Sequence, residues 1–348
     1  MRRLIHGMLR KLRLIGSDYL GTLKCFGGVL APNGNIYFAP FGLTKILELN
    51  PNTLSTQLVG NDVFDSNSVC VGGVLAPNGN IYFCPNGNYI IKFNPNTKIV
   101  TKIPTSSGYY GGVLAPNGNI YFAPQTGKKK IKEFNPVTNV INYIDIPVIT
   151  GNSTSMYYGG VLAPNGNIYF CPGSANKVLE LNPNTSAVQL VGSNYPDSNK
   201  WVSGSLALNG NIYFAPLGAS QILELNPNTL TTKLVGSVYN NVGNRYAGGV
   251  LAPNGNIYFV PVNSSKVLEL NPDTLTTRLI GNNLIGNDKW NSGVLAPNGN
   301  IYFAPRNINQ IGELSGVNSP NVLGTNMLIP ANLADLPTSN YNMYYNKY

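Results

Sequence analysis

Charge is scarce in this chain, and histidine is almost absent. Charged residues make up 11% of the 348 residues, about half the usual share. The single histidine, His6, excludes metal sites built from several histidines and argues against histidine acid–base catalysis. No nucleophile elbow, phosphate-binding loop or paired-cysteine metal motif occurs. The sequence therefore predicts no catalytic residue, no metal site and no cofactor.

Cysteine is also too rare for a disulfide framework in a chain of this length. We expect free, buried thiols at Cys25, Cys70, Cys84 and Cys171. The alternative is a disulfide between Cys25 and Cys70. No stretch approaches the roughly 18 continuous apolar residues of a membrane span. Basic residues interrupt the apolar residues near the start, where a secretory signal needs an unbroken run. We expect an intracellular protein without a secretory signal or membrane insertion.

The charge that is present is mostly positive, with a formal net charge of +9. One basic group lies at the start of the chain, and a second, a possible basic patch, is formed by Lys128, Lys129, Lys130 and Lys132. Such residues attract nucleic acid and other polyanions without specificity. We take solubility as their main role and keep nucleic-acid binding as a minor alternative.

A repeat dominates the sequence. The phrase VLAPNGNIYF begins at Val29, Val74, Val113, Val161, Val250 and Val294, and the variant SLALNGNIYF begins at Ser205. The copies are 45, 39, 48, 44, 45 and 44 residues apart. This period, combined with strand-like composition, is typical of propeller blades of four strands each. The sequence predicts an all-β, seven-bladed β-propeller with blades starting near residues 26, 71, 110, 158, 202, 247 and 291.

One unit, residues 26–60, shows how the four strands arise. GGVLA and IYFAP are expected strands joined by PNGN, whose Asn33-Gly34 pair favours a two-residue type I′ turn. KILEL is the third strand, and the Asn50–Thr53 turn leads to LSTQLVG, the fourth. Helical periodicity is absent, and Gly and Pro recur too often for long helices.

The seventh unit lacks a typical fourth strand, and the chain start supplies a candidate. RLIGSDYLGTLKC, from Arg13, aligns without a gap with RLIGNNLIGNDKW, from Arg278. We therefore expect residues 11–15 to complete the last blade and close the ring. The propeller then spans 1–315, and 316–348 form a tail rich in Asn, Pro and Tyr.

The two ends of such a ring differ. The PNGN and NPNT turns are nearly identical in most copies, whereas the linkers at the other end differ in every copy. Because recognition of one partner needs non-identical groups, we expect binding at the variable end. The residues expected to ring the mouth of the channel and contact a partner are Tyr109, Tyr157, Trp201, Tyr246 and Trp290, with packing beneath the loops as the alternative.

Three repeated features favour structure over chemistry. The Glu of LELNP recurs in six copies, and a residue repeated six times does not build a unique site, so we expect it to be solvated or bonded to the turns. The Tyr of IYF is expected to pack between blades. Gly pairs such as Gly27-Gly28 are expected to permit crowding near the axis.

The unit NGNIYFAP…KILELNPNTL resembles the repeats of the virginiamycin B lyase and NHL-type propellers. That lyase family relies on histidine and acidic residues around a bound magnesium, and no blade here carries such a histidine. A closer likeness is to VLAPNGxIY-repeat proteins of mimivirus-like large DNA viruses, some bacteria and protists. This resemblance implies a virus-encoded protein of the host cytoplasm or the virion.

These observations favour a non-catalytic binding or scaffold propeller with a protein partner. The alternatives are a glycan-binding propeller that uses the same aromatic residues and, less favoured, a metal-dependent lyase or lactonase.

Overall fold

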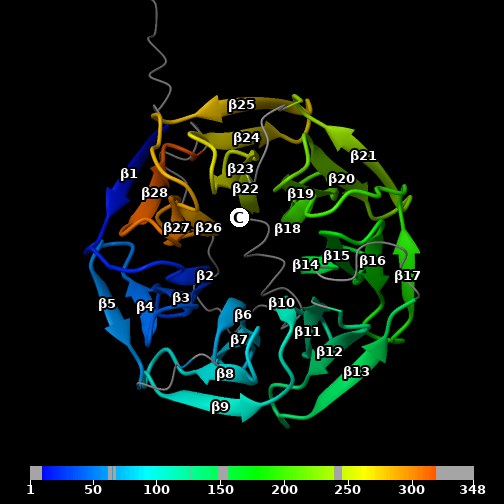
Figure 1. Ribbon diagram of the computed structural model, residues 1–348, viewed down its shortest axis with the longest axis horizontal. Coiled ribbons are helices and arrows are strands. Elements are labelled where there is room, and N and C mark those ends of the chain that lie inside the picture. Colours follow the sequence, from blue (N-terminus) through cyan, green and yellow to red (C-terminus); the bar gives the residue numbers. More distant parts are fainter. Residues whose placement is uncertain are drawn as a thin grey trace, which may run out of the picture.

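Seven four-stranded antiparallel sheets form a closed ring around a central axis (Figure 1). The computed structural model describes residues 10–61, 65, 68–125, 127–147, 156–238 and 245–318. No helix within these ranges is long and apolar enough to cross a membrane. The predicted all-β, seven-bladed propeller is confirmed. Most of the predicted tail, from residue 319 onward, lies outside the described residues.

Each blade places its first strand against the axis and its fourth at the rim (Figure 1). The innermost strands are β2 (Cys25–Leu30), β6 (Cys70–Leu75), β10 (Tyr109–Leu114), β14 (Tyr157–Leu162), β18 (Trp201–Leu206), β22 (Tyr246–Leu251) and β26 (Trp290–Leu295). The second strands are β3 (Ile36–Pro40), β7 (Ile81–Pro85), β11 (Ile120–Pro124), β15 (Ile168–Pro172), β19 (Ile212–Pro216), β23 (Ile257–Pro261) and β27 (Ile301–Pro305).

The third strands are β4 (Ile46–Leu49), β8 (Tyr89–Phe93), β12 (Lys130–Phe134), β16 (Val178–Leu181), β20 (Ile222–Asn226), β24 (Val267–Asn271) and β28 (Ile311–Ser315). The outermost strands are β5 (Thr56–Val59), β9 (Val100–Pro104), β13 (Ile141–Asp145), β17 (Val188–Val191), β21 (Thr231–Val235), β25 (Thr276–Ile280) and β1 (Lys11–Ile15). Blades one to six run from β2–β5 to β22–β25, and blade seven combines β26–β28 with β1.

Ring closure follows the prediction. Strand β1 pairs antiparallel with β28, from Lys11 opposite Ser315 to Ile15 opposite Ile311. Leu12 and Ile15 are buried, and Arg13 forms an ion pair with Glu313 of β28. The chain start therefore supplies the outer strand of the last blade, and the buried side chains of β1 hold it in place.

The first hairpin differs from its prediction. Gly34 has φ +81°, but Asn33 has no positive φ, so the turn is not type I′, which needs positive φ at both central residues. The Gly34 N–H donates to Ala31 O at 2.9 Å, and the Ala31 N–H donates to Asn35 O at 2.9 Å. The loop is thus three residues long, with Pro32 starting a turn that a left-handed glycine completes.

The cores lie between neighbouring blades. One core joins Tyr37 and Ile46 of blade one to Phe83 and Phe93 of blade two, and the Tyr37 and Phe93 ring centroids are 4.9 Å apart. The predicted packing role of the repeated Tyr is confirmed. All four cysteines are free and buried, so the alternative of a Cys25–Cys70 disulfide is not realised.

Glycine is required where the inner strands approach the axis. Strand β2 has a β-bulge between Cys25 and Gly28, and the bulged Gly27 has φ +90°. A Cβ on Gly27 would lie 2.7 Å from the Cα of Gly72 in the next blade. Neighbouring backbones therefore touch at this level, as the Gly pairs predicted.

The hairpins and the linkers lie at opposite ends of the ring. Register places Cys25 opposite Pro40, at the end where the linkers enter, and Leu30 opposite Ile36, beside the PNGN hairpin. We call the end with the repeated hairpins the uniform face and the end with the linkers the variable face.

Candidate functional site

The predicted aromatic ring lies at the variable end of the inner strands, but its side chains are buried. Exposure is at most 2% for the five residues Tyr109, Tyr157, Trp201, Tyr246 and Trp290. In this structure they pack beneath the loops, which was the alternative interpretation, and their direct contact with a partner stays a prediction.

Three of the five have polar atoms with partners inside the blade. Trp201 Nε1 donates to Gln221 O at 2.9 Å, and Trp290 Nε1 donates to Gln310 O at 3.2 Å. Each acceptor directly precedes the third strand of the same blade. The Tyr246 hydroxyl similarly lies 2.7 Å from Ser264 Oγ. These side chains tie the start of the inner strand to the loop between the second and third strands of the same blade.

The mouth of the channel is formed by the next residue along each inner strand. Successive side chains in a strand point to opposite faces, so a shift of one residue turns the side chain toward the axis. We call these the mouth positions: Phe26, Val71, Tyr110, Tyr158, Val202, Ala247 and Asn291. The sequence showed the variety of these residues. The alternation of side chains along a strand was the signal that would have identified them as the axial positions. Tyr110, Tyr158 and Asn291 are partly exposed there, and the other four side chains are buried.

Tyr110 and Tyr158 are the largest partly exposed groups at the mouth positions. Their rings meet edge to face with centroids 4.9 Å apart, and both pack against the cluster that contains Val202 and Ala247. Burial raises the pKa of Tyr110, and Arg306 and Asn291 of blade seven oppose that rise. Because those groups belong to a non-adjacent blade, Tyr110 reaches across the mouth.

Arg306 supplies a cation at the same place. Its guanidinium lies 4.9 Å from the Phe26 ring centroid, and Nη1 forms a 2.9 Å ion pair with Asp288. Phe26 in turn packs against Phe41, with centroids 4.6 Å apart. Aromatic and Arg side chains are enriched at binding hot spots. We name Phe26, Phe41, Tyr110, Tyr158 and Arg306 the mouth cluster.

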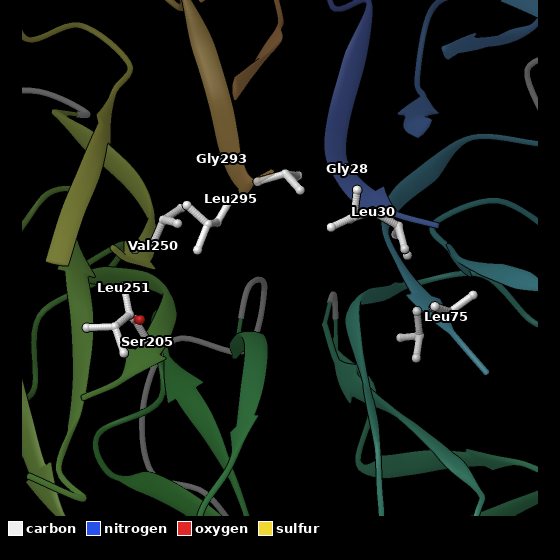
Figure 2. Close-up of a pocket in the computed structure, with 13 residues that line it drawn as sticks. Gly28, Leu30, Leu75, Ser205, Val250, Leu251, Gly293 and Leu295 are labelled. Atoms are coloured by element: carbon white, nitrogen blue, oxygen red, sulfur yellow. The ribbon is translucent and has the colours of Figure 1, made fainter. Parts of the chain in front are cut away.

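A cavity of about 140 Å³ lies on the axis between the mouth positions and the uniform face. Its wall consists of Gly, Val and Leu from the inner strands, and Ser205 is the one polar side chain among the residues that line it (Figure 2). A specific small-molecule site needs several placed polar groups. This cavity therefore lacks the features of such a site, and we take the mouth cluster as the candidate site.

The predicted basic patch is divided. Lys129 and Lys130 are exposed, and Lys130 forms a 3.1 Å ion pair with Asp145. Lys132 is fully buried, with Nζ 4.1 Å from the Tyr109 ring centroid and 2.6 Å from both Thr105 Oγ1 and Ser106 O. Burial lowers the pKa of Lys132 to about 7. Lys132 therefore supports the loops from beneath and does not belong to a surface patch.

Three further buried lysines hold the linkers, and the sequence reasoning missed them. Lys24, Lys200 and Lys289 each precede the first residue of an inner strand, and each donates to a carbonyl three residues earlier. Lys200 also donates to Gly173 O and Ala175 O, both at 3.1 Å. A Lys directly before Cys or Trp in three linkers was the available signal.

Of the two states expected for the repeated Glu, solvated or bonded to the turns, the structure shows the second. Glu48 Oε1 accepts from Asn35 Nδ2 at 2.6 Å, from the Tyr37 hydroxyl at 2.8 Å and from Lys98 Nζ at 2.6 Å. In blade two, where Lys92 replaces Glu, the Tyr82 hydroxyl donates to Pro136 O at 2.9 Å instead. Within the described residues, no group of three or more His, Cys, Asp and Glu could hold a metal ion.

Comparison with known proteins agrees with the architecture. Neither family models nor curated proteins gave a match. A streptogramin B lyase structure is 18% identical, with a TM-score of 0.73 over 89% of this chain and 98% of that chain. A catalytically inactive histidine-to-alanine variant of virginiamycin B lyase from Staphylococcus aureus, with quinupristin, is 14% identical, with a TM-score of 0.73 over 88% and 99%.

A third solved structure, U3-55K, is 9% identical, with a TM-score of 0.65 over 87% of this chain and 98% of that chain. At such identities, these likenesses show a shared fold alone. The resemblance of the repeat to virginiamycin B lyase-type propellers is thus confirmed at the level of the fold.

Proposed function

We propose that this chain is a non-catalytic interaction propeller that binds a protein partner through its variable face. The observation that carries the proposal is the mouth cluster, where aromatic side chains and Arg306 gather at the axis. Seven equivalent mouth positions hold five residue types, whereas the hairpins at the uniform face are nearly identical. Recognition of one partner needs such individuality, and a rigid scaffold that presents loops is a common way to provide it.

The composition of the repeats supports a role without catalysis. The lyase variant named above is inactive after replacement of a single histidine. The one histidine of this chain, His6, precedes the repeats and lies outside the described residues. A glycan-binding role would require exposed ring faces, and both tryptophans of the chain are buried.

The test is affinity capture from the cells in which the protein is made. We expect a partner that the wild type retains and that the double variant Tyr110→Ala, Tyr158→Ala loses by about 30-fold or more in affinity, as hot-spot aromatics do. Tyr143→Ala is the matched control, because Tyr143 is 44% exposed on the outer strand of the same blade.

A partner retained by the mouth variant would contradict the proposal, as would one lost equally with Tyr143→Ala. The melting temperature of each variant is measured alongside, so that loss of binding is separated from unfolding.

A further inference from the structure

Charge is distributed unequally along the ring axis. The second-strand Tyr lies opposite the third-strand Glu, as Tyr37 lies opposite Glu48. The level of this residue pair, called the Tyr–Glu row, divides each blade into two halves. We define the uniform half as this row and everything toward the hairpins. The variable half is everything on the other side, toward the linkers. Each charged residue among the described residues falls into one half by its register or by its loop.

Among the described residues, the variable half holds thirteen cations and only five acids. The cations are Lys24, Lys45, Lys102, Lys128, Lys129, Lys130, Lys132, Lys177, Lys200, Arg245, Lys266, Lys289 and Arg306. The acids are Asp18, Asp65, Asp145, Asp197 and Asp288. The uniform half is balanced, with seven of each sign: Arg10, Lys11, Arg13, Lys92, Lys98, Lys233 and Arg278 against six repeated Glu and Asp273. The positive charge of the ring therefore lies at one end.

In the uniform half, four of the five buried carboxylates have cationic neighbours. Glu269 pairs with both Arg10 and Arg278, and Glu313 pairs with Arg13. Lys98 and Lys233 reach Glu48 and Glu224 at 2.6 and 3.2 Å. Opposite charges thus meet within blades and between neighbouring blades, and little net field leaves this end.

In the variable half, the buried ammonium groups lie against oxygens that carry no formal charge. Lys24, Lys132, Lys200 and Lys289 bond to backbone carbonyls, and Lys132 also bonds to a threonine hydroxyl. Asp197 and Asp288 act electrostatically on Lys200 and Lys289 without an ion pair to them. Three of the acids pair elsewhere: Asp65 with Lys102, Asp145 with Lys130 and Asp288 with Arg306.

Apolar side chains project from the same end. Leu20 is 80% exposed and Ile285 is 94% exposed. They occupy equivalent positions in the linkers GSDYLGTLKC and GNNLIGNDKW, four residues before Lys24 and Lys289. The buried lysines hold these linkers by their backbone, so the apolar tips are presented on supported loops.

We propose that the variable face binds a segment of a partner protein, and that this segment is acidic and also carries apolar side chains. The inference rests on the proposed function and specifies the chemistry of the partner. A face with an excess of one sign attracts and orients a partner of the other sign. Nucleic acid fits less well, because phosphate contacts need Lys and Arg at the surface, and five cations of the variable half are buried: Lys24, Lys132, Lys200, Arg245 and Lys289. The exposed apolar tips likewise suit a protein.

The experiment measures fluorescence anisotropy of a labelled peptide of alternating Glu and Leu on the full chain. We expect binding that weakens as salt rises, and a decrease of about tenfold in Lys177→Glu, Lys266→Glu. The control is Lys11→Glu, Lys92→Glu, which changes the net charge equally at the uniform half and is expected to leave affinity within about twofold. A Glu–Ser peptide and the variant Leu20→Ser, Ile285→Ser are expected to bind more weakly.

Equal weakening by the two charge-reversed variants would overturn the inference, because net charge alone would then explain binding. An oligothymidylate that binds as tightly as the Glu–Leu peptide would also overturn it, in favour of nucleic acid. A third outcome separates the two proposals: a captured partner whose binding is lost in Tyr110→Ala, Tyr158→Ala but is unaffected by salt and by Lys177→Glu, Lys266→Glu. This result would support the proposed function and overturn only the inference that the bound segment is acidic.

Discussion

At the scale of single residues, Lys132 shows how burial couples charge to stability. Its ammonium group lies between the Tyr109 ring and the Thr105–Ser106 loop. Burial lowers its pKa to about 7, from 10.5 in the unfolded chain. Between these values the unfolded state binds more protons than the folded state, so stability rises with pH across this window and falls as pH drops toward 7.

We therefore predict that the unfolding free energy of the wild type, relative to Lys132→Met, increases from pH 7 to pH 9. The slope is at most about 1.4 kcal/mol per pH unit. Urea denaturation of both proteins at each pH measures this difference in unfolding free energy. The contributions of titratable groups common to both proteins cancel in the difference. A difference that stays constant or falls with pH would show that Lys132 keeps its proton throughout.

The neighbouring pair Tyr109 and Tyr110 shows why a site is harder to predict than a fold. Tyr109 is 2% exposed, whereas Tyr110 reaches across the mouth toward blade seven. Both are tyrosines at the start of the same strand, and only their direction separates them. A β-bulge between Tyr110 and Gly112 interrupts the alternation of side chains along this strand, so the repeat pattern alone does not show which tyrosine faces the axis.

At the scale of the strand, the β2 bulge limits how closely the blades can approach the axis. Gly27→Ala places a Cβ 2.7 Å from Gly72 Cα, a contact that only backbone movement relieves. We predict a loss of about 2–4 kcal/mol of unfolding free energy, combining the positive φ with the clash.

Gly34→Ala is the matched control for this strand. Gly34 also has positive φ, +81°, but an added Cβ there meets nothing within 4 Å. It is expected to cost only about 1–2 kcal/mol, the part that comes from backbone conformation. Equal losses in the two variants would show that the close approach of the blades is not limiting.

At the scale of the whole molecule, stability depends on β1, because one strand closes the ring. We predict that Leu12→Ser, Ile15→Ser, which removes two buried side chains of β1, lowers the unfolding free energy by on the order of 5 kcal/mol. Deletion of residues 1–15 is expected to lower the melting temperature further.

Lys11→Ser, Leu14→Ser changes two exposed residues of the same strand, where Leu14 is 46% exposed, and is expected to have little effect. Calorimetry of the three proteins separates these cases. Unchanged melting after the deletion would mean that β1 does not close the ring.

The charge polarity is also a property of the whole molecule. Apart from the two basic groups, the sequence does not show at which end of the ring each charge lies, and the value of +9 does not show it either. Folding sorts them because each blade repeats one register, which sends every third-strand Glu to the uniform half and most linker lysines to the variable half.

The sequence alone determined the seven blades, the hairpin and linker ends, the closing strand and the packing role of the repeated Tyr. These follow from periodicity and turn chemistry, which act between residues close in the chain or repeated at fixed spacing. Only the tertiary structure decided which side chain of each inner strand faces the axis, that Lys24, Lys132, Lys200 and Lys289 are buried, and that positive charge gathers at one face. Those outcomes depend on bulges and on contacts between blades, which bring together residues far apart in sequence.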